Sequence, residues 1–180
     1  SNSVSIIDLA TNTNTGAFTA INPGIVRVNS NNGDIYVSSS PNIIRIYDAT
    51  TISILDIMLS DNFISAMAYN PSNNTMYVST LGASLLIPID GNSYSTLSTI
   101  SIGGFPNALQ FSSTDDLIIV TTSGDNRYVG VDVNNTITGS VNLHNLSGGL
   151  AINQQDNLIW TTDVIGDTLY RVGFPETCTD

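Results

Sequence analysis

Acidic side chains are the residues of this chain with the clearest capacity for chemistry. The chain contains fourteen aspartates and one glutamate but only four arginines, and it contains no lysine. Ca²⁺ binds six to eight oxygen ligands, often from carboxylates. Asp125, Asp163 and Asp167 fall in predicted loops that we expect on one face, but their spacing is not that of an EF-hand loop. Two interpretations stay open, a Ca²⁺ site or solvated carboxylates, and no other cofactor is indicated.

The histidine, serine and lysine content of the chain gives little support to nucleophilic or acid–base catalysis. His144 is the single histidine, which cannot form a histidine-rich zinc site, and no carboxylate is identified to orient it as a general base. No Gly-x-Ser-x-Gly elbow is present. Without lysine, Schiff-base chemistry and P-loop phosphate binding are excluded. We therefore predict no catalytic residue and interpret His144 as a surface loop residue.

Three Asn-x-Ser/Thr sequons begin at Asn73, Asn134 and Asn145. Each falls in a predicted turn or link, where a glycan would remain in solvent. They favour a secreted glycoprotein, although a chain so rich in Asn, Ser and Thr also acquires sequons through composition alone.

Composition narrows the list of partners. Charged residues are 11% of the chain and the net charge is -11, so a phosphate backbone or an anionic lipid surface would be repelled. Cys178, the lone cysteine, cannot form a disulfide within the chain and is expected to be a free thiol or to pair elsewhere. No apolar run of membrane-spanning length and no signal segment is evident. Because an initiator Met is lacking, we expect a processed product or a piece of a longer protein.

A structural repeat must position these residues. Similar β-rich triplets recur at separations of 41, 42 and 41 residues. They are Ile35-Tyr36-Val37, Met76-Tyr77-Val78, Ile118-Ile119-Val120 and Ile159-Trp160-Thr161. A second marker, an apolar residue followed by aspartate, keeps the same period, as does a third at Asn29, Asn70, Ser112 and Asn153. Periods near 40 residues made of short strands are typical of β-propeller blades, which bury their faces by stacking.

The predicted fold is all-β, a propeller of four-stranded antiparallel blades with repeats of about 41–42 residues. Propeller repeats span 1–173, with two strands in 3–21, blades at about 24–59, 63–102, 106–143 and 147–173, and a tail at 174–180. Each blade contains strands a to d in chain order. A closed four-bladed ring and part of a larger propeller, completed by more repeats or another copy, are both compatible with this count.

The repeated residues have structural interpretations. Asn and Asp between strands a and b tolerate left-handed dihedrals and allow hairpins. Aspartates after strand c, at the same place in each blade, are spread around the molecule, so we expect them to cap turns and not to share one ion. They are Asp8, Asp48, Asp90 and Asp132. The aromatic side chains of Tyr36, Tyr77, Phe111 and Trp160 are predicted to pack between blades.

At these residues the sequence resembles the YVTN family of β-propeller repeats. Tyr36-Val37-Ser38 and Tyr77-Val78-Ser79-Thr80 carry the motif of the name, and Val4-Ser5-Ile6-Ile7-Asp8 fits the third strand. The later units depart from it, with Ile-Ile-Val-Thr and Ile-Trp-Thr-Thr at the motif. The resemblance implies an extracellular or cell-surface protein whose propeller is a rigid interaction platform.

Three functions remain open at this point. The first is a non-enzymatic extracellular or cell-surface module for structure, adhesion or recognition, which binds a protein or glycan or self-associates through exposed strand edges. The second is a propeller enzyme, a metal-dependent lactonase or lyase with its site at the central channel. The third is an intracellular scaffold. Fold alone does not decide among them.

Propeller sites usually lie around the channel, on the face formed by the b-to-c loops and the d-to-a links. We expect this face to collect eight residues. They are Asp61, Asn62, Phe63, Phe105, Asp125, Asn126, Asp163 and Asp167.

Overall fold

The computed structural model describes residues 2–48, 54–59, 63–143, 149–163 and 168–173. Within these ranges the regular structure consists of seventeen β-strands in five antiparallel sheets. Each sheet is a meander in which strands consecutive in sequence are hydrogen-bonded neighbours. The prediction of an all-β fold with four-stranded antiparallel blades is confirmed.

The N-terminal sheet pairs β1 (Ser3–Asp8) with β2 (Thr13–Thr19). Blade 1 contains β3 (Pro23–Val28), β4 (Ile35–Ser39), β5 (Ile43–Tyr47) and β6 (Ile54–Met58). Blade 2 contains β7 (Ile64–Asn70), β8 (Thr75–Thr80), β9 (Leu85–Asp90) and β10 (Ile100–Ser101). Blade 3 contains β11 (Pro106–Ser112), β12 (Leu117–Thr122), β13 (Arg127–Val131) and β14 (Ile137–Asn142). Blade 4 contains β15 (Leu150–Asn153), β16 (Leu158–Asp163) and β17 (Thr168–Val172).

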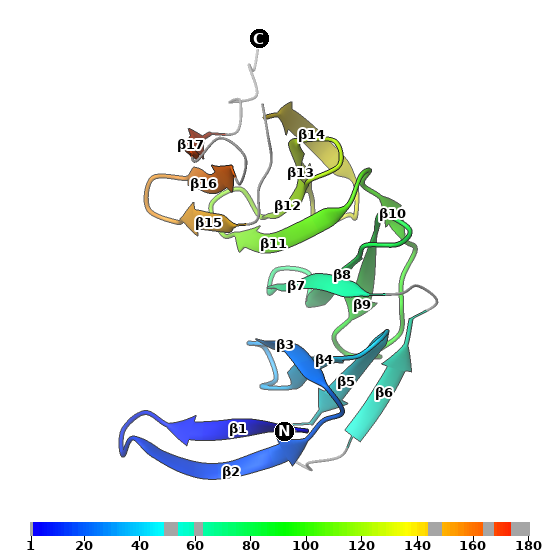
Figure 1. Ribbon diagram of the computed structural model, residues 1–180, viewed down its shortest axis with the longest axis vertical. Helices are drawn as coiled ribbons and strands as arrows, with labels where there is room; N and C mark the ends of the chain where they lie inside the picture. Colours follow the sequence, from blue (N-terminus) through cyan, green and yellow to red (C-terminus); the bar gives the residue numbers. More distant parts are fainter. Residues whose placement is uncertain (1, 49–53, 60–62, 144–148, 164–167, 174–180) are drawn as a thin grey trace.

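The sheets are arranged radially along an open arc, with β3, β7, β11 and β15 on its inner side (Figure 1). Neighbouring inner strands are in contact, β3 with β7, β7 with β11 and β11 with β15. The N-terminal sheet and blade 4 lie at opposite ends of the arc and belong to separate sheets. The described residues therefore do not form a closed four-bladed ring, since that ring would need these two sheets to merge.

A separate hydrophobic core fills each space between consecutive sheets. Tyr36 lies in the core between blades 1 and 2, and Tyr77 in the core between blades 2 and 3; both are fully buried. Phe111 packs against the latter core from its edge. Trp160 is only half-buried and belongs to none of these cores, since its register places it on the face of blade 4 that no described blade covers.

The polar marker at the end of each first strand starts the a-to-b turn. Asn29 accepts a hydrogen bond through Oδ1 from the backbone N–H of Asn31 at 2.9 Å, and Asn70 and Asn153 make the same bond. Four residues after the marker the chain enters the left-handed region. The residues there are Gly33, Asn74, Asp116 and Asn157. These are the residue types that tolerate a positive φ, which explains why the marker and the Asn-rich turns share one period.

The aspartates after the third strands lie in the c-to-d turns. The Asp8 carboxylate accepts from the backbone N–H of Ala10 at 2.8 Å, and Asp132 accepts from Asn134 and Thr136 at 3.0 and 2.8 Å. Asp90 accepts from the backbone N–H groups of Asn92 and Ser93. The turn after Asp48 is outside the described residues. Where the turn is described, the carboxylate caps it.

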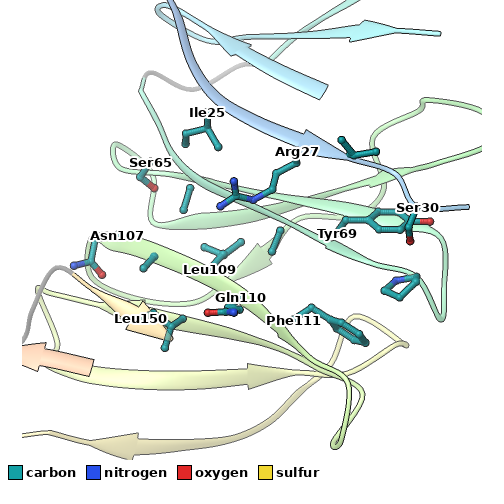
Figure 2. Close-up of a pocket in the computed structure, with 15 residues that line it drawn as sticks. Ile25, Arg27, Ser30, Ser65, Tyr69, Asn107, Leu109, Gln110, Phe111 and Leu150 are labelled. Carbon is teal, nitrogen blue, oxygen red and sulfur yellow. The ribbon is translucent and has the colours of Figure 1, made fainter. Parts of the chain in front are cut away.

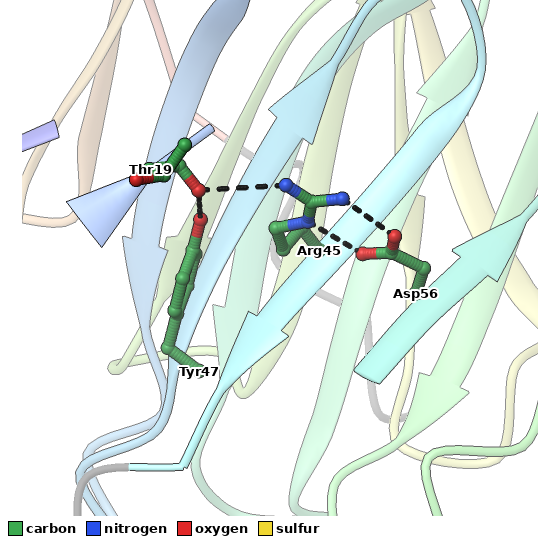
Figure 3. A network of polar contacts seen from close by, with 4 residues as sticks. All are labelled: Thr19, Arg45, Tyr47 and Asp56. Atoms are coloured by element: carbon green, nitrogen blue, oxygen red, sulfur yellow. Dashed lines mark hydrogen bonds and ion pairs between the residues drawn. The ribbon is translucent and has the colours of Figure 1, made fainter. Parts of the chain in front are cut away.

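Two side chains of β5 join the N-terminal sheet to blade 1 (Figure 3). Arg45 forms a bidentate ion pair with Asp56, with both N–O distances 2.6 Å, and also donates to the backbone carbonyl of Thr19 at 3.4 Å. The Tyr47 hydroxyl donates to the same carbonyl, and its ring lies 4.6 Å from that of Phe18. The carbonyl of Thr19, at the end of β2, thus accepts hydrogen bonds from both side chains.

Candidate binding groove

The loop face predicted for a metal site does not gather its aspartates in the described chain. Asp125 accepts from the backbone N–H of Gly104 at 2.7 Å and lies 3.6 Å from Arg127, so its carboxylate fixes the link between blades 2 and 3. Asp163 is buried and has interaction partners of its own. Asp61, Asn62 and Asp167 are outside the described residues. Among the residues that the structure does describe, no three His, Cys, Asp or Glu side chains are placed to hold a metal ion.

Phe63 and Phe105 lie on this loop face, more than half exposed and with positive φ angles. Strained backbone often marks functional sites, but Asn22 has the same backbone conformation one repeat earlier. The three residues each precede the first strand of a blade. The left-handed conformation is therefore shared by the residues that precede blades 1, 2 and 3, and it does not by itself mark a functional site.

A large hollow of the described surface is elsewhere, on the inner side of the arc. It is a groove of about 760 Å³ across β3, β7 and β11, with Leu150 of β15 at its margin. Figure 2 shows Arg27 above the groove from β3, with Gln110 and Phe111 of β11 opposite and Tyr69 of β7 at one end. This volume lies in the range of small-molecule binding sites, which is about 300–1,000 Å³.

Strand register explains why the groove exists. Arg27, Ala68, Gln110 and Ala151 pair with the equivalent residue of the second strand in their own blades, so they occupy the same position of the inner strands. Blade 2 has alanine at this position and again at Ala66, where longer side chains would occupy the space. The groove floor is therefore β7, and the longer side chains of Arg27 and Gln110 flank it.

The guanidinium of Arg27 is held by backbone carbonyls of two blades. Its Nε donates to the carbonyl of Met67 at 2.8 Å, and its Nη1 donates to the carbonyl of Val26 at 2.9 Å. A guanidinium has five N–H donors. No described residue accepts a hydrogen bond from Nη2, and the Arg27 side chain is part of the groove lining.

Arg27 also differs from two of the other arginines in its charge environment. Arg45 pairs with Asp56 and Arg127 with Asp125, whereas no described carboxylate forms an ion pair with Arg27. In a chain of net charge -11, a cation without a carboxylate partner at the margin of a groove is a candidate anion-binding group.

Two aromatic side chains, Tyr69 and Phe111, line the same end of the groove. The Tyr69 hydroxyl donates to Oδ1 of Asn74 at 2.6 Å, and burial raises the pKa of this tyrosine. Tyr69 therefore remains a neutral donor across physiological pH. Phe111 rests on the core between blades 2 and 3. Both rings are held by packing that does not depend on a ligand.

The sequons differ in structure. The Asn73 side chain is half-buried, and its Nδ2 donates to the Tyr77 hydroxyl at 2.9 Å and to the carbonyl of Val133 at 3.0 Å. Contrary to expectation, this side chain lies between blades 2 and 3 and not in solvent. Asn134 is exposed. Asn145, His144 and Cys178 are outside the described residues.

The groove was not anticipated from the sequence. A signal was present, because alignment on the polar marker places Arg27 and Gln110 opposite two alanines at an inner-strand position. Recognising it requires knowing that Arg27 and Gln110 line one groove, which depends on how neighbouring blades stack.

Comparison with known proteins defines the class of fold. No family model and no curated protein matches the sequence. The structure is similar to dihydro-heme d1 dehydrogenase NirN, solved in complex with DHE, with a TM-score of 0.80 and 10% identity over 96% of this chain and 40% of that one. A chain of the mitotic checkpoint complex gives a TM-score of 0.81 and 11% identity, covering 97% and 57%. Hydrazine synthase from Kuenenia stuttgartiensis gives 0.73 and 17% identity, covering 94% and 55%.

These likenesses establish a β-propeller fold, as in NirN and hydrazine synthase. At such low identity they establish the fold alone. The chain spans about half the length of the solved structures that it matches. No helix in the described ranges has the length and apolar character needed to cross a membrane.

Proposed function

We propose that this chain is a non-enzymatic recognition module of a YVTN-type β-propeller, which binds its ligand in the groove between β3, β7 and β11. One observation carries the proposal. A groove of about 760 Å³ has at its margin an arginine whose position is fixed by two backbone carbonyls and which has no carboxylate partner in the described chain. Such convergent polar groups in a concave site are typical of ligand binding.

Rigidity of the groove walls supports this function. Asn29 donates to Asn74 across blades 1 and 2 at 3.0 Å, and Gln154 of blade 4 accepts from Ser113 of blade 3 at 2.8 Å. Because these bonds join the turns beside the inner strands, the walls are fixed before a ligand arrives. A preorganised site loses less entropy on binding than a mobile one.

We further propose an extracellular or cell-surface location, with a protein or glycan as the natural partner. The exposed side chain of Asn134 within a sequon supports this location. The resemblance to surface propellers and the scarcity of charged groups, 11% of residues, point the same way.

Binding to arrays of glycans and peptides tests the function, with a variant that fills the groove. Val28 lines the groove and is 51% exposed, so Val28→Trp adds bulk there without disturbing a core. Leu169→Trp is the matched control, because Leu169 is 58% exposed on β17, away from the groove. We expect array ligands to be lost by Val28→Trp and retained by Leu169→Trp. Equal binding by both variants would overturn the groove as the site.

A further inference from the structure

The chemistry of the groove specifies a class of ligand more closely than a recognition function does, and this step rests on the proposed function. Arg27 is the only charged residue among the described residues that line the groove. Its Nη2 amino group has no acceptor in the described chain, and Nη1 uses one donor on the carbonyl of Val26. The end of the guanidinium formed by Nη1 and Nη2 can therefore donate two parallel hydrogen bonds to one anion.

That geometry matches a carboxylate. Arginine and carboxylate form bidentate pairs in which both N–H···O bonds are charge-assisted, and such pairs are stronger than neutral hydrogen bonds. The bond from Nε to the carbonyl of Met67 fixes the plane of the guanidinium. Because Arg27 is already ordered, little side-chain entropy remains to be lost on binding.

The remaining lining favours a hydroxyl-bearing ring as the body of the ligand. The Gln110 side chain is half-buried beside the groove and makes no hydrogen bond to a described residue, so its amide can both donate to and accept from hydroxyl groups. Tyr69 and Phe111 add aromatic surface on which the apolar face of a ring can pack. An acidic sugar has all three features, a carboxylate, hydroxyl groups and a ring with an apolar face.

We propose that the groove binds an acidic sugar residue, with its carboxylate on Arg27, its hydroxyl groups on Gln110 and its ring against the Tyr69 and Phe111 end. The net charge of -11 does not exclude this ligand. Charges farther away than about 10 Å are largely screened at 0.1 M salt, whereas the contact with Arg27 is direct.

Titration of the whole chain with glucuronic acid, followed by NMR chemical shifts at physiological salt, tests the proposal. Glucose is the matched neutral ligand, and acetate supplies the carboxylate without a ring. The decisive variant is Arg27→Gln. Arg171→Gln is its charge-matched control, since Arg171 is an exposed residue of β17 that does not line the groove. Thermal unfolding of each variant verifies that it is folded.

We expect glucuronic acid to bind at least tenfold more tightly than glucose, and Arg27→Gln to abolish this preference, because a charge-assisted pair contributes roughly that factor. Acetate, which forms the pair without a ring or hydroxyl groups, should bind more weakly than glucuronic acid. Gln110→Ala should weaken glucuronic acid binding and leave acetate binding unchanged. Equal binding of glucuronic acid and glucose, or equal effects of Arg27→Gln and Arg171→Gln, would overturn the acidic sugar. If array ligands still depend on Val28 in that case, the recognition function stands and only the ligand class is wrong.

Discussion

The Tyr94 hydroxyl donates a hydrogen bond to Oδ2 of Asp34 at 2.6 Å, although the two residues are 60 positions apart. Tyr94 lies in the turn after β9 of blade 2, and Asp34 is buried just before β4 of blade 1. The bond therefore joins the turns of these two blades. It also holds a buried carboxylate against a phenol, and this pairing makes the contact between blades sensitive to alkaline pH.

Stability should decline between about pH 10 and pH 12 through Tyr94. The bond to Asp34, together with burial, raises the pKa of Tyr94 to about 12, whereas an unfolded tyrosine titrates near 10. The stabilisation is thus complete below pH 10 and is lost as the pH rises through the folded pKa. Tyr94→Phe should cost about 1 kcal/mol at neutral pH, and this cost should decrease as the pH rises above 10 and through the folded pKa. Urea unfolding across this range measures the difference, and a constant difference would contradict the assignment.

Tyr77→Phe should destabilise the fold by about 1–3 kcal/mol, because a buried acceptor and donor lose their partner. The Tyr77 hydroxyl donates to Oδ1 of Asn135 at 2.7 Å and accepts from Asn73 at 2.9 Å, both between blades 2 and 3. Urea unfolding gives the change in free energy. Tyr170→Phe on β17 is the control, since its hydroxyl bonds to no described residue, and it should change stability by less than about 0.5 kcal/mol. A similar effect of both substitutions would show that this contact does not join the blades.

Asp90 should contribute to stability in a way that disappears in acid. Hydrogen bonds from the backbone N–H and hydroxyl of Ser93 hold the pKa of Asp90 below its ordinary value. The contribution of the charge is therefore present above the unfolded pKa, about 3.9, and is lost as the pH falls through the lower folded value. Asp90→Asn keeps an acceptor without the charge, so it should be less stable than the natural chain at pH 7 and closer to it in stability near pH 2. Thermal unfolding at both pH values measures this, and an equal gap at the two would refute it.

Glycan occupancy should distinguish two sequons that look alike in sequence. Both amide hydrogens of Asn73 are used, on the Tyr77 hydroxyl and the carbonyl of Val133, and a glycan on this nitrogen would remove at least one bond. Asn134 is exposed, and its amide makes only a long contact of 3.4 Å with Asp132. After expression in a secretory host, peptide mass mapping should find Asn134 occupied and Asn73 unmodified in the folded fraction. Full occupancy of Asn73 in folded protein would contradict this placement.

The blade could be predicted because its signals are local. Asn70 and Asn74 start and end a turn whose dihedrals few residues tolerate, and Asp90 caps another with its own carboxylate. Each requirement acts within a few residues, so it is written into the sequence at every repeat. The radial stacking of the blades could also be predicted, because a single small sheet leaves apolar faces that a neighbouring sheet must cover.

The binding site could not be predicted in the same way, because it depends on which side chains different blades bring to one place. The sequence directed attention to Asp125 and Asp163, yet Asp125 fixes a link between blades and Asp163 is buried. Arg27 carries no local motif, and its partner at 2.8 Å, the carbonyl of Met67, is 40 residues away. Asn73 was misplaced for the same reason, because nothing near it in sequence reveals that Val133 lies beside it.

Most of the described polar contacts that cross from one blade to the next join uncharged groups, as in Asn29 with Asn74, Tyr77 with Asn135 and Tyr128 with the carbonyl of Gly173. Dissolved ions screen attractions between charges but leave amide and hydroxyl pairs nearly untouched. The repulsion among the many aspartates, by contrast, weakens as ions are added. We expect a fold assembled in this way to be at least as stable at high salt concentration as at low salt concentration.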